Sequence, residues 1–171
     1  RDLMTGVTHI LGGIAAGVAG STFTGMEGVS AVGFTCASIA GSLFPDIDLC
    51  TSKAGSKAKP VSFLISHTFG HRTLFHSPLL YTIIYLLCNH YMPYLHPWIL
   101  AFTVGAASHL LLDMFNYKGI PLLYPLSKHY HIASIKTGGK GEAAFGVVLA
   151  GAVFLMIAAR ISGVPFPASQ I

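Results

Sequence analysis

The sequence contains very little charge. Only 9% of its 171 residues are Asp, Glu, Lys or Arg, whereas soluble domains carry about 25% charged residues. Hydrophobic residues make up 53% of the chain, and the mean hydropathy is +0.65. A soluble domain of this size has too much surface for its volume to bury so much apolar area. The composition therefore excludes an ordinary soluble domain and predicts that lipid covers part of the protein.

Paired cysteines are also missing. The chain has 3 cysteines, Cys36, Cys50 and Cys88, and no CxxC pair. An odd number without paired spacing indicates neither a disulfide framework nor a zinc finger. Cys36 and Cys88 lie in apolar runs, where a free thiol behaves as a small hydrophobic side chain.

What the chain does have is a series of apolar runs, at about residues 9–23, 29–44, 73–94, 98–115 and 143–161. The first two are built from small residues, which let helix backbones approach closely, and they are short for a crossing that needs about 20 residues. The first run leads directly into further apolar segments, so we expect it to be retained rather than cleaved. The pattern predicts an all-α, polytopic membrane helix bundle of about five membrane helices, forming a single domain over residues 1–171.

Two polar stretches, residues 46–72 and 116–141, separate these runs and form the two large loops. Five crossings place both loops and the amino terminus on the same side of the membrane. All of the 10 Lys and Arg residues except Arg160 then lie on that side. The positive-inside rule makes it cytoplasmic. We interpret the net charge of +4 as topological charge beside anionic lipid head groups, and we expect no nucleic-acid partner.

The scarce polar residues collect at the same side. The cytoplasmic ends of the predicted helices carry His9, Asp46, Asp48, His71, His76, His109, Asp113 and Glu142. Ionisable groups at membrane depth are costly and usually functional. Convergence of such distant residues at one depth is stronger evidence for a site than any single motif.

Each motif alone is weak. His109 and Asp113 are four residues apart and share one helix face, so both can reach one metal ion; the alternative is a buried His hydrogen-bonded to an Asp. Asp46 and Asp48 follow a proline, and carboxylates held together repel unless a cation or proton lies between them. One or both can bind metal, or the pair can form a helix stop and cap.

Imidazole and carboxylate ligands without thiolate suit zinc, manganese or iron. We expect a divalent metal, zinc first, as one or two ions, because the candidates exceed the needs of one tetrahedral zinc ion. Two ions can lower the pKa of a bridging water and stabilise a leaving oxygen. The candidate metal ligands are His9, Asp46, Asp48, His76, His109 and Asp113.

Other residues are candidates for catalysis or substrate binding. Arg72 has the forked donors that suit a phosphate or carboxylate, although it could be another topological charge. His71 or Glu142 could act as general base or acid. His67 either extends the site or faces solvent, His129 and His131 could gate the site or bind substrate head groups, and His90 and His96 near the opposite face are structural or interfacial.

Several of these motifs together resemble a known family. They are Thr8-His9 with Gly12 and Gly13, Leu43-Phe44-Pro45-Asp46-Ile47-Asp48, His71-Arg72 with His76-Ser77, and Ser108-His109 with Asp113. In this combination the sequence resembles the YdjM-like family of bacterial inner-membrane, metal-dependent hydrolases (LexA-regulated). The resemblance implies a hydrolase with a metal site in the bacterial inner membrane and implies no particular substrate. The Lys-rich loop at residues 50–66 is not part of the pattern.

The sequence therefore predicts a membrane-bound metallohydrolase that acts on a lipid or lipid-linked head group, with a phosphoester preferred, at the cytoplasmic leaflet. A metal-ion or proton transporter is the first alternative, because intramembrane His and Asp residues also mark ion paths. A transporter would, however, need polar residues at several depths. The second alternative is a structural membrane protein with a stabilising metal.

Overall fold

A computed structural model describes residues 6–48, 52, 55–57, 59–69, 74–117, 119–121, 128–136 and 138–163. Its helices are α1 (Gly6–Phe23), α2 (Gly28–Leu43), α3 (Lys59–Phe69), α4 (Pro78–Tyr91), α5 (His96–Met114) and α6 (Lys140–Ile161), with short 3₁₀ helices η1 (Pro45–Asp48), η2 (Leu74–His76) and η3 (Pro93–Leu95). Extended pairing within these residues is limited to isolated bridges at Asn116–Ile135 and Ile120–Tyr130. The all-α prediction is confirmed.

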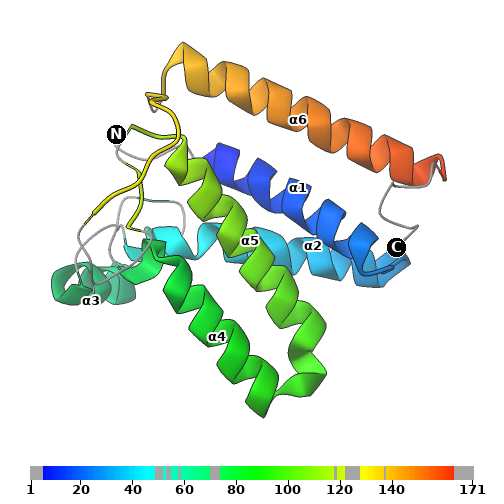
Figure 1. Ribbon diagram of the computed structural model, residues 1–171, viewed down its shortest axis with the longest axis horizontal. Coiled ribbons are helices and arrows are strands. Elements are labelled where there is room, and N and C mark those ends of the chain that lie inside the picture. The colour runs from blue at the N-terminus through cyan, green and yellow to red at the C-terminus, as the bar shows by residue number, and fades with distance from the viewer. Residues whose placement is uncertain are drawn as a thin grey trace.

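The helices alternate in direction, so that one end of the bundle collects many helix ends. The amino ends of α1, α4 and α6 and the carboxyl ends of α2 and α5 lie at the end of the bundle where α3 also lies (Figure 1). We call this the site end. The turns from α1 to α2 and from α4 to α5 lie away from it (Figure 1).

Among the described residues, 4 helical stretches are long and apolar enough to cross a membrane: Gly6–Phe23, Gly28–Asp48, Pro93–Met114 and Lys140–Ile161. The remaining predicted crossing, residues 73–94, is shorter than expected. Ser77 caps α4, its Oγ accepting from the Leu79 amide, and Pro78 begins the helix, leaving only 14 residues. At about 1.5 Å per residue, α4 is shorter than the roughly 30 Å hydrocarbon core. A fifth crossing stays a prediction.

Small residues bring α1, α2 and α5 into close contact, as the composition of the first two runs predicts. A Cβ added at Gly41 of α2 would overlap the Phe102 carbonyl oxygen of α5, and one at Gly105 of α5 would overlap the Ser38 carbonyl oxygen of α2. The Ser38 hydroxyl in turn donates to the Gly13 carbonyl of α1 at 2.9 Å. These contacts fix the register of the three helices and so position the polar residues at their ends.

The first polar stretch is more ordered than the predicted loop, because it contains η1 and α3. Pro60 lies in the first turn of α3, where its missing N–H costs no helical hydrogen bond. Ser62 is buried, whereas Phe63 and Leu64 are 65% and 64% exposed. Lys53, Lys57 and Lys59 make this stretch look like a polar loop in the sequence, so the short helix is not predicted.

The second polar stretch folds back on the end of α5. The Ile132 amide donates to the Met114 carbonyl at 2.7 Å, and the Ile135 amide donates to the Phe115 carbonyl at 3.0 Å. Ile120 and Tyr130 exchange both backbone hydrogen bonds. The described part of this loop is therefore attached to the helix that carries His109 and Asp113.

Candidate metal centre

A buried cluster of histidines and aspartates lies at the site end. The structure brings together all the candidate metal ligands: His9 from α1, Asp46 and Asp48 from η1, His76 from η2, and His109 and Asp113 from α5. Each is between 0 and 3% exposed. The convergence on which the sequence argument depends is present in the fold, and segments as distant as α1 and α5 contribute to it.

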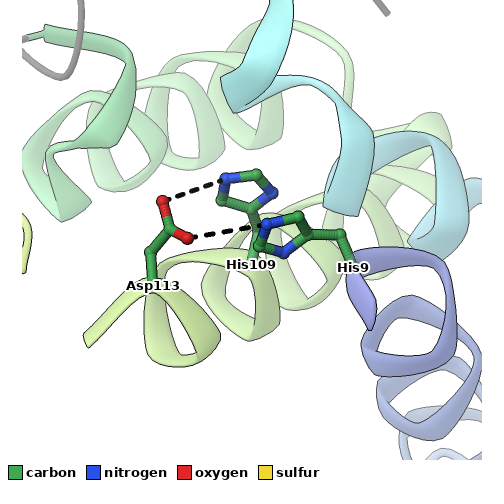
Figure 2. A group of neighbouring side chains, drawn as sticks. All are labelled: His9, His109 and Asp113. Carbon is green, nitrogen blue, oxygen red and sulfur yellow. Dashed lines mark ion pairs between the residues drawn. The ribbon is translucent and has the colours of Figure 1, made fainter. Parts of the chain in front are cut away.

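Asp113 is the centre of the cluster. Its Oδ1 lies 3.5 Å from His9 Nε2, and its Oδ2 lies 3.5 Å from His76 Nε2 and 3.7 Å from His109 Nε2. Figure 2 shows the Asp113 carboxylate directed at His9 and His109, with His109 one turn earlier on the same face of α5. The two carboxylate oxygens thus point at different imidazoles.

The two aspartates of η1 have separate partners. Asp46 Oδ1 lies 3.8 Å from His109 Nε2, and Asp48 Oδ2 lies 3.3 Å from His76 Nδ1. The 3₁₀ turn begins at Pro45 and directs the two side chains at different histidines. It therefore does more than stop α2, and both carboxylates belong to the cluster.

His109 is oriented by a backbone group. Its Nδ1 lies 2.6 Å from the Ser42 carbonyl oxygen of α2. A carbonyl can only accept, so Nδ1 carries the proton and donates it, leaving a lone pair on Nε2 in the neutral ring. Metal-binding histidines are commonly fixed in this way. The His9 ring stacks on His109 with centroids 3.7 Å apart.

The donors fit a divalent metal ion. His109 Nε2 and Asp46 Oδ1 are both buried and have no hydrogen-bond partner among the described residues, an arrangement that is costly unless a cation or proton compensates it. Two ligands about 2.1 Å from one tetrahedral ion lie about 3.4 Å apart, and the His–Asp separations here run from 3.3 to 3.8 Å.

Two overlapping groups of ligands are present. His9, His109 and Asp113 form one group, and Asp46, His76 and His109 form the other, with the ligand atoms of each group within 4.8 Å of one another. His109 has only one nitrogen left for a metal, because Nδ1 is bound to Ser42. Asp113 has two oxygens facing different histidines, so it could bridge two ions.

The electrostatics of the cluster call for positive charge. Burial favours the neutral form of His76, which lies outside the candidate membrane spans, but the adjacent Asp113 and Asp48 carboxylates outweigh burial and raise its pKa to about 9. Without a bound cation His76 would therefore carry a proton at pH 7. A metal ion binding there must displace this proton.

The predicted catalytic residues fare differently. His71 and Arg72 lie outside the described residues. Glu142 is buried on α6; its Oε1 accepts from the Thr8 hydroxyl at 3.0 Å, and its Oε2 accepts from the Gly138 amide at 2.6 Å. Glu142 thus ties α6 to the residue that precedes His9, and its role as acid or base stays a prediction.

The other histidines lie apart from the cluster. His67 is exposed on α3 and stacks on Phe63, and His129 and His131 are exposed in the second loop. A gating or head-group role for the loop pair stays a prediction. At the opposite end, His96 Nε2 lies 3.1 Å from the Tyr85 hydroxyl, in agreement with a structural role.

Sequence reasoning missed two supporting residues. The Tyr81 hydroxyl donates to the Phe75 carbonyl at 2.8 Å and so holds the η2 turn that carries His76. A tyrosine in an apolar run resembles the other apolar residues around it, so the sequence gives no signal that Tyr81 supports the site. The Ser42 carbonyl acts through the backbone, which leaves no signal in the sequence.

The chain is similar to several known proteins. The family described as "YdjM inner membrane protein" matches residues 4–166. YvsG of Bacillus subtilis (strain 168) is 37% identical over 149 residues, which cover 86% of this chain and 89% of YvsG. Inner membrane protein YdjM of Escherichia coli (strain K12) is 36% identical over 89 residues, which cover 48% of this chain and 44% of that protein. No solved structure matches the chain.

Proposed function

The chain belongs to the YdjM inner membrane protein family, and we propose that it is a membrane-bound, metal-dependent hydrolase acting on a lipid or lipid-linked head group, with a phosphoester as the preferred bond. The observation that carries the proposal is the buried His–Asp cluster, in which His109 Nε2 and Asp46 Oδ1 face each other without a hydrogen bond. Such a cluster costs stability unless a cation occupies it.

The proposed metal ligands fall into two overlapping groups, His9 with His109 and Asp113, and Asp46 with His76 and His109. Each group would hold one ion, His109 can serve only one of them through Nε2, and Asp48 lies beside His76. A divalent ion bound there supplies a Lewis acid and lowers the pKa of a water molecule toward 7. The chain's own contribution is to fix the imidazoles, as Ser42 does for His109, and to exclude bulk water from the buried site. We assign phosphate binding to Arg72 and proton transfer to His71 or Glu142.

The position of the site favours a lipid substrate. The site lies at the ends of candidate membrane spans, where a lipid head group would lie. Exposed lysines occur on the segments at the site end, including Lys57, Lys59, Lys136 and Lys140, and they suit an anionic head group. We place this end in the cytoplasm by the positive-inside rule.

A transporter is the weaker reading. Among the described residues, the buried ionisable side chains gather at the site end. Arg160, near the other end, donates to the Ser21 hydroxyl at 2.7 Å, to the Thr22 hydroxyl at 3.0 Å and to the Met26 carbonyl. Its hydrogen bonds hold the α1–α2 turn to α6 rather than line a polar path between the two ends.

Metal analysis of the purified protein, followed by a lipid-hydrolysis screen with that metal restored, tests the proposal. We expect His109→Ala to lose both metal and turnover while still inserting into the membrane. His90→Ala, which alters an exposed histidine on α4, should keep both. Turnover without metal would contradict the proposal, as would metal-dependent ion flux in liposomes without hydrolysis of any lipid.

A further inference from the structure

An apolar crevice separates α6 from α1 at the site end. Val7 and Leu11 of α1 and Ala143, Gly146, Val147 and Ala150 of α6 line it, and its volume is about 360 Å³. Its remaining lining, Thr8, Gly138, Gly139 and Glu142, forms a polar end. We propose that this crevice binds an acyl chain of an anionic phospholipid, with the phosphate at the polar end.

The crevice persists because α6 is held to the bundle at two points. The Thr8–Glu142 hydrogen bond joins α6 to α1 at the site end, and Arg160 binds Ser21 and Thr22 near the other end. Between these points, a Cβ added at Gly146 would meet nothing within 4 Å. Small residues usually let helices close on each other, yet here they face open space.

Hydrocarbon is the occupant that the surroundings favour. Both walls belong to candidate membrane spans, and only 6% of the α6 span is buried, against 33 to 39% of the other three. A void between apolar walls forfeits dispersion contacts. A flexible acyl chain from the surrounding bilayer restores these dispersion contacts without burying a polar group.

Basic residues flank the polar end, where both oxygens of the Glu142 carboxylate already accept hydrogen bonds from Thr8 and Gly138. Lys140 is the first residue of α6, and the Lys136 backbone lies against Gly139 at the polar end. Both lysines are exposed. Basic side chains near a membrane surface attract anionic lipids, so this end favours an anionic over a zwitterionic head group.

The polar end of the crevice adjoins the metal centre through neighbouring residues of α1. Thr8 at its polar end directly precedes His9, whose Nε2 lies 3.5 Å from Asp113. Here the inference rests on the proposed function, because it takes the lipid held in the crevice to be the substrate. The substrate class is then a phospholipid whose acyl chain lies between α1 and α6.

Photo-crosslinking in liposomes tests the inference directly. The probe is phosphatidylglycerol with a diazirine on one acyl chain, and mass spectrometry locates the adducts. Gly146→Leu fills the crevice, and Gly151→Leu is its matched control, because a Cβ at Gly151 also meets nothing within 4 Å but Gly151 does not line the crevice. We expect adducts on the crevice residues to fall about tenfold in Gly146→Leu and to persist in Gly151→Leu.

A second pair of measurements examines the polar end. Replacing Lys136 and Lys140 together by Gln should weaken labelling by the phosphatidylglycerol probe and leave labelling by a diacylglycerol probe with the same chains unchanged. Equal crevice labelling in Gly146→Leu and the parent protein would overturn the inference. Equal loss with both probes in the lysine variant would overturn the assignment of the phosphate.

Labelling needs no turnover, so its outcome is separate from that of the hydrolase proposal. Crevice labelling that depends on Gly146, in a protein that hydrolyses nothing, would support the lipid site and contradict the hydrolase proposal. Hydrolysis of a water-soluble phosphoester by a protein whose crevice is never labelled would support hydrolase activity and contradict the lipid site.

Discussion

At the scale of single residues, the cluster depends on how each imidazole is held. His109 is fixed by the Ser42 carbonyl, and His76 lies between Asp48 and Asp113. The sequence predicted that these residues meet, because topology alone brings helix ends together. It could not predict which aspartate faces which histidine, because that depends on the 3₁₀ turn at η1, nor could it reveal a backbone carbonyl as a partner.

Asp113→Asn is the sharpest single-residue test of the cluster. The change keeps the shape of the side chain but removes the negative charge that three imidazoles face at 3.5 to 3.7 Å. Because altering even an outer partner of a metal ligand costs about 10–100-fold in affinity, we expect the metal affinity to fall by at least about 100-fold. Competition with a calibrated chelator measures it. An affinity within twofold of the parent would show that Asp113 is not a ligand.

The pKa of His76 predicts how metal binding depends on pH. Its pKa is raised to about 9, so the metal-free protein holds a proton at neutral pH and must release it when metal binds. Affinity should therefore rise with pH and level off above about 9. A chelator titration at several pH values measures this, and an affinity that falls as pH rises would contradict it.

The same shift affects the metal-free protein. A histidine whose pKa in the folded state exceeds its unfolded value stabilises the fold fully below the unfolded pKa of about 6.5, and loses that contribution as pH rises through the folded value. The chelated protein should therefore melt at a lower temperature at pH 9 than at pH 6.5. The metal-loaded protein should not share this loss, since the cation replaces the proton.

At the scale of elements, the apolar runs located α1, α2, α5 and α6 to within a few residues, because a long apolar helix is a strong signal. Two elements, α4 and α3, differ from the prediction. The run at residues 73–94 predicts a single crossing helix, but Ser77 and Pro78 cap and begin α4 within it. α3 is not predicted, because its 11 residues are too few for a crossing and it begins at Lys59 in a stretch that also contains Lys53 and Lys57.

The close contact between α2 and α5 positions the site, so separating the two helices should disturb it. In Gly105→Ala the new Cβ would overlap the Ser38 carbonyl oxygen, so the two helices must move apart, and His109 lies one turn farther along α5. We expect a loss of about 1–3 kcal/mol in stability together with weaker metal binding. Thermal unfolding in detergent measures the first and metal content the second.

Gly151→Ala is the control, because a Cβ there meets nothing within 4 Å. Alanine favours a helix over glycine by about 1 kcal/mol, so this variant should be as stable as the parent or slightly more so. If Gly105→Ala behaved in the same way, the close contact of α2 with α5 would not be what positions His109.

At the scale of the whole molecule, the alternating direction of the helices makes the site. Residues separated by most of the chain, such as Thr8 and Glu142, meet because α1 and α6 begin at the same end (Figure 1). Charge distribution predicts that this end faces the cytoplasm. The apolar pattern predicts the number of crossings only approximately, because α4, with 14 residues, is shorter than a full crossing.

Cysteine accessibility tests both orientation and the path of α4. In a background lacking the native cysteines, Lys57→Cys reports on the site end, and Tyr94→Cys reports on the turn between α4 and α5, where Tyr94 is 75% exposed. We expect an impermeant thiol reagent to label Lys57→Cys in inside-out vesicles and Tyr94→Cys in intact spheroplasts. Labelling of both positions from the same side would contradict five crossings.

The central claim, that the buried histidines and aspartates form a metal centre, is tested most directly by metal K-edge X-ray absorption of the purified protein, normalised to protein concentration. We expect one or two ions per chain in a shell of nitrogen and oxygen at about 2.0–2.2 Å. A chain without stoichiometric metal, or a shell containing sulfur at about 2.3 Å, would contradict the account.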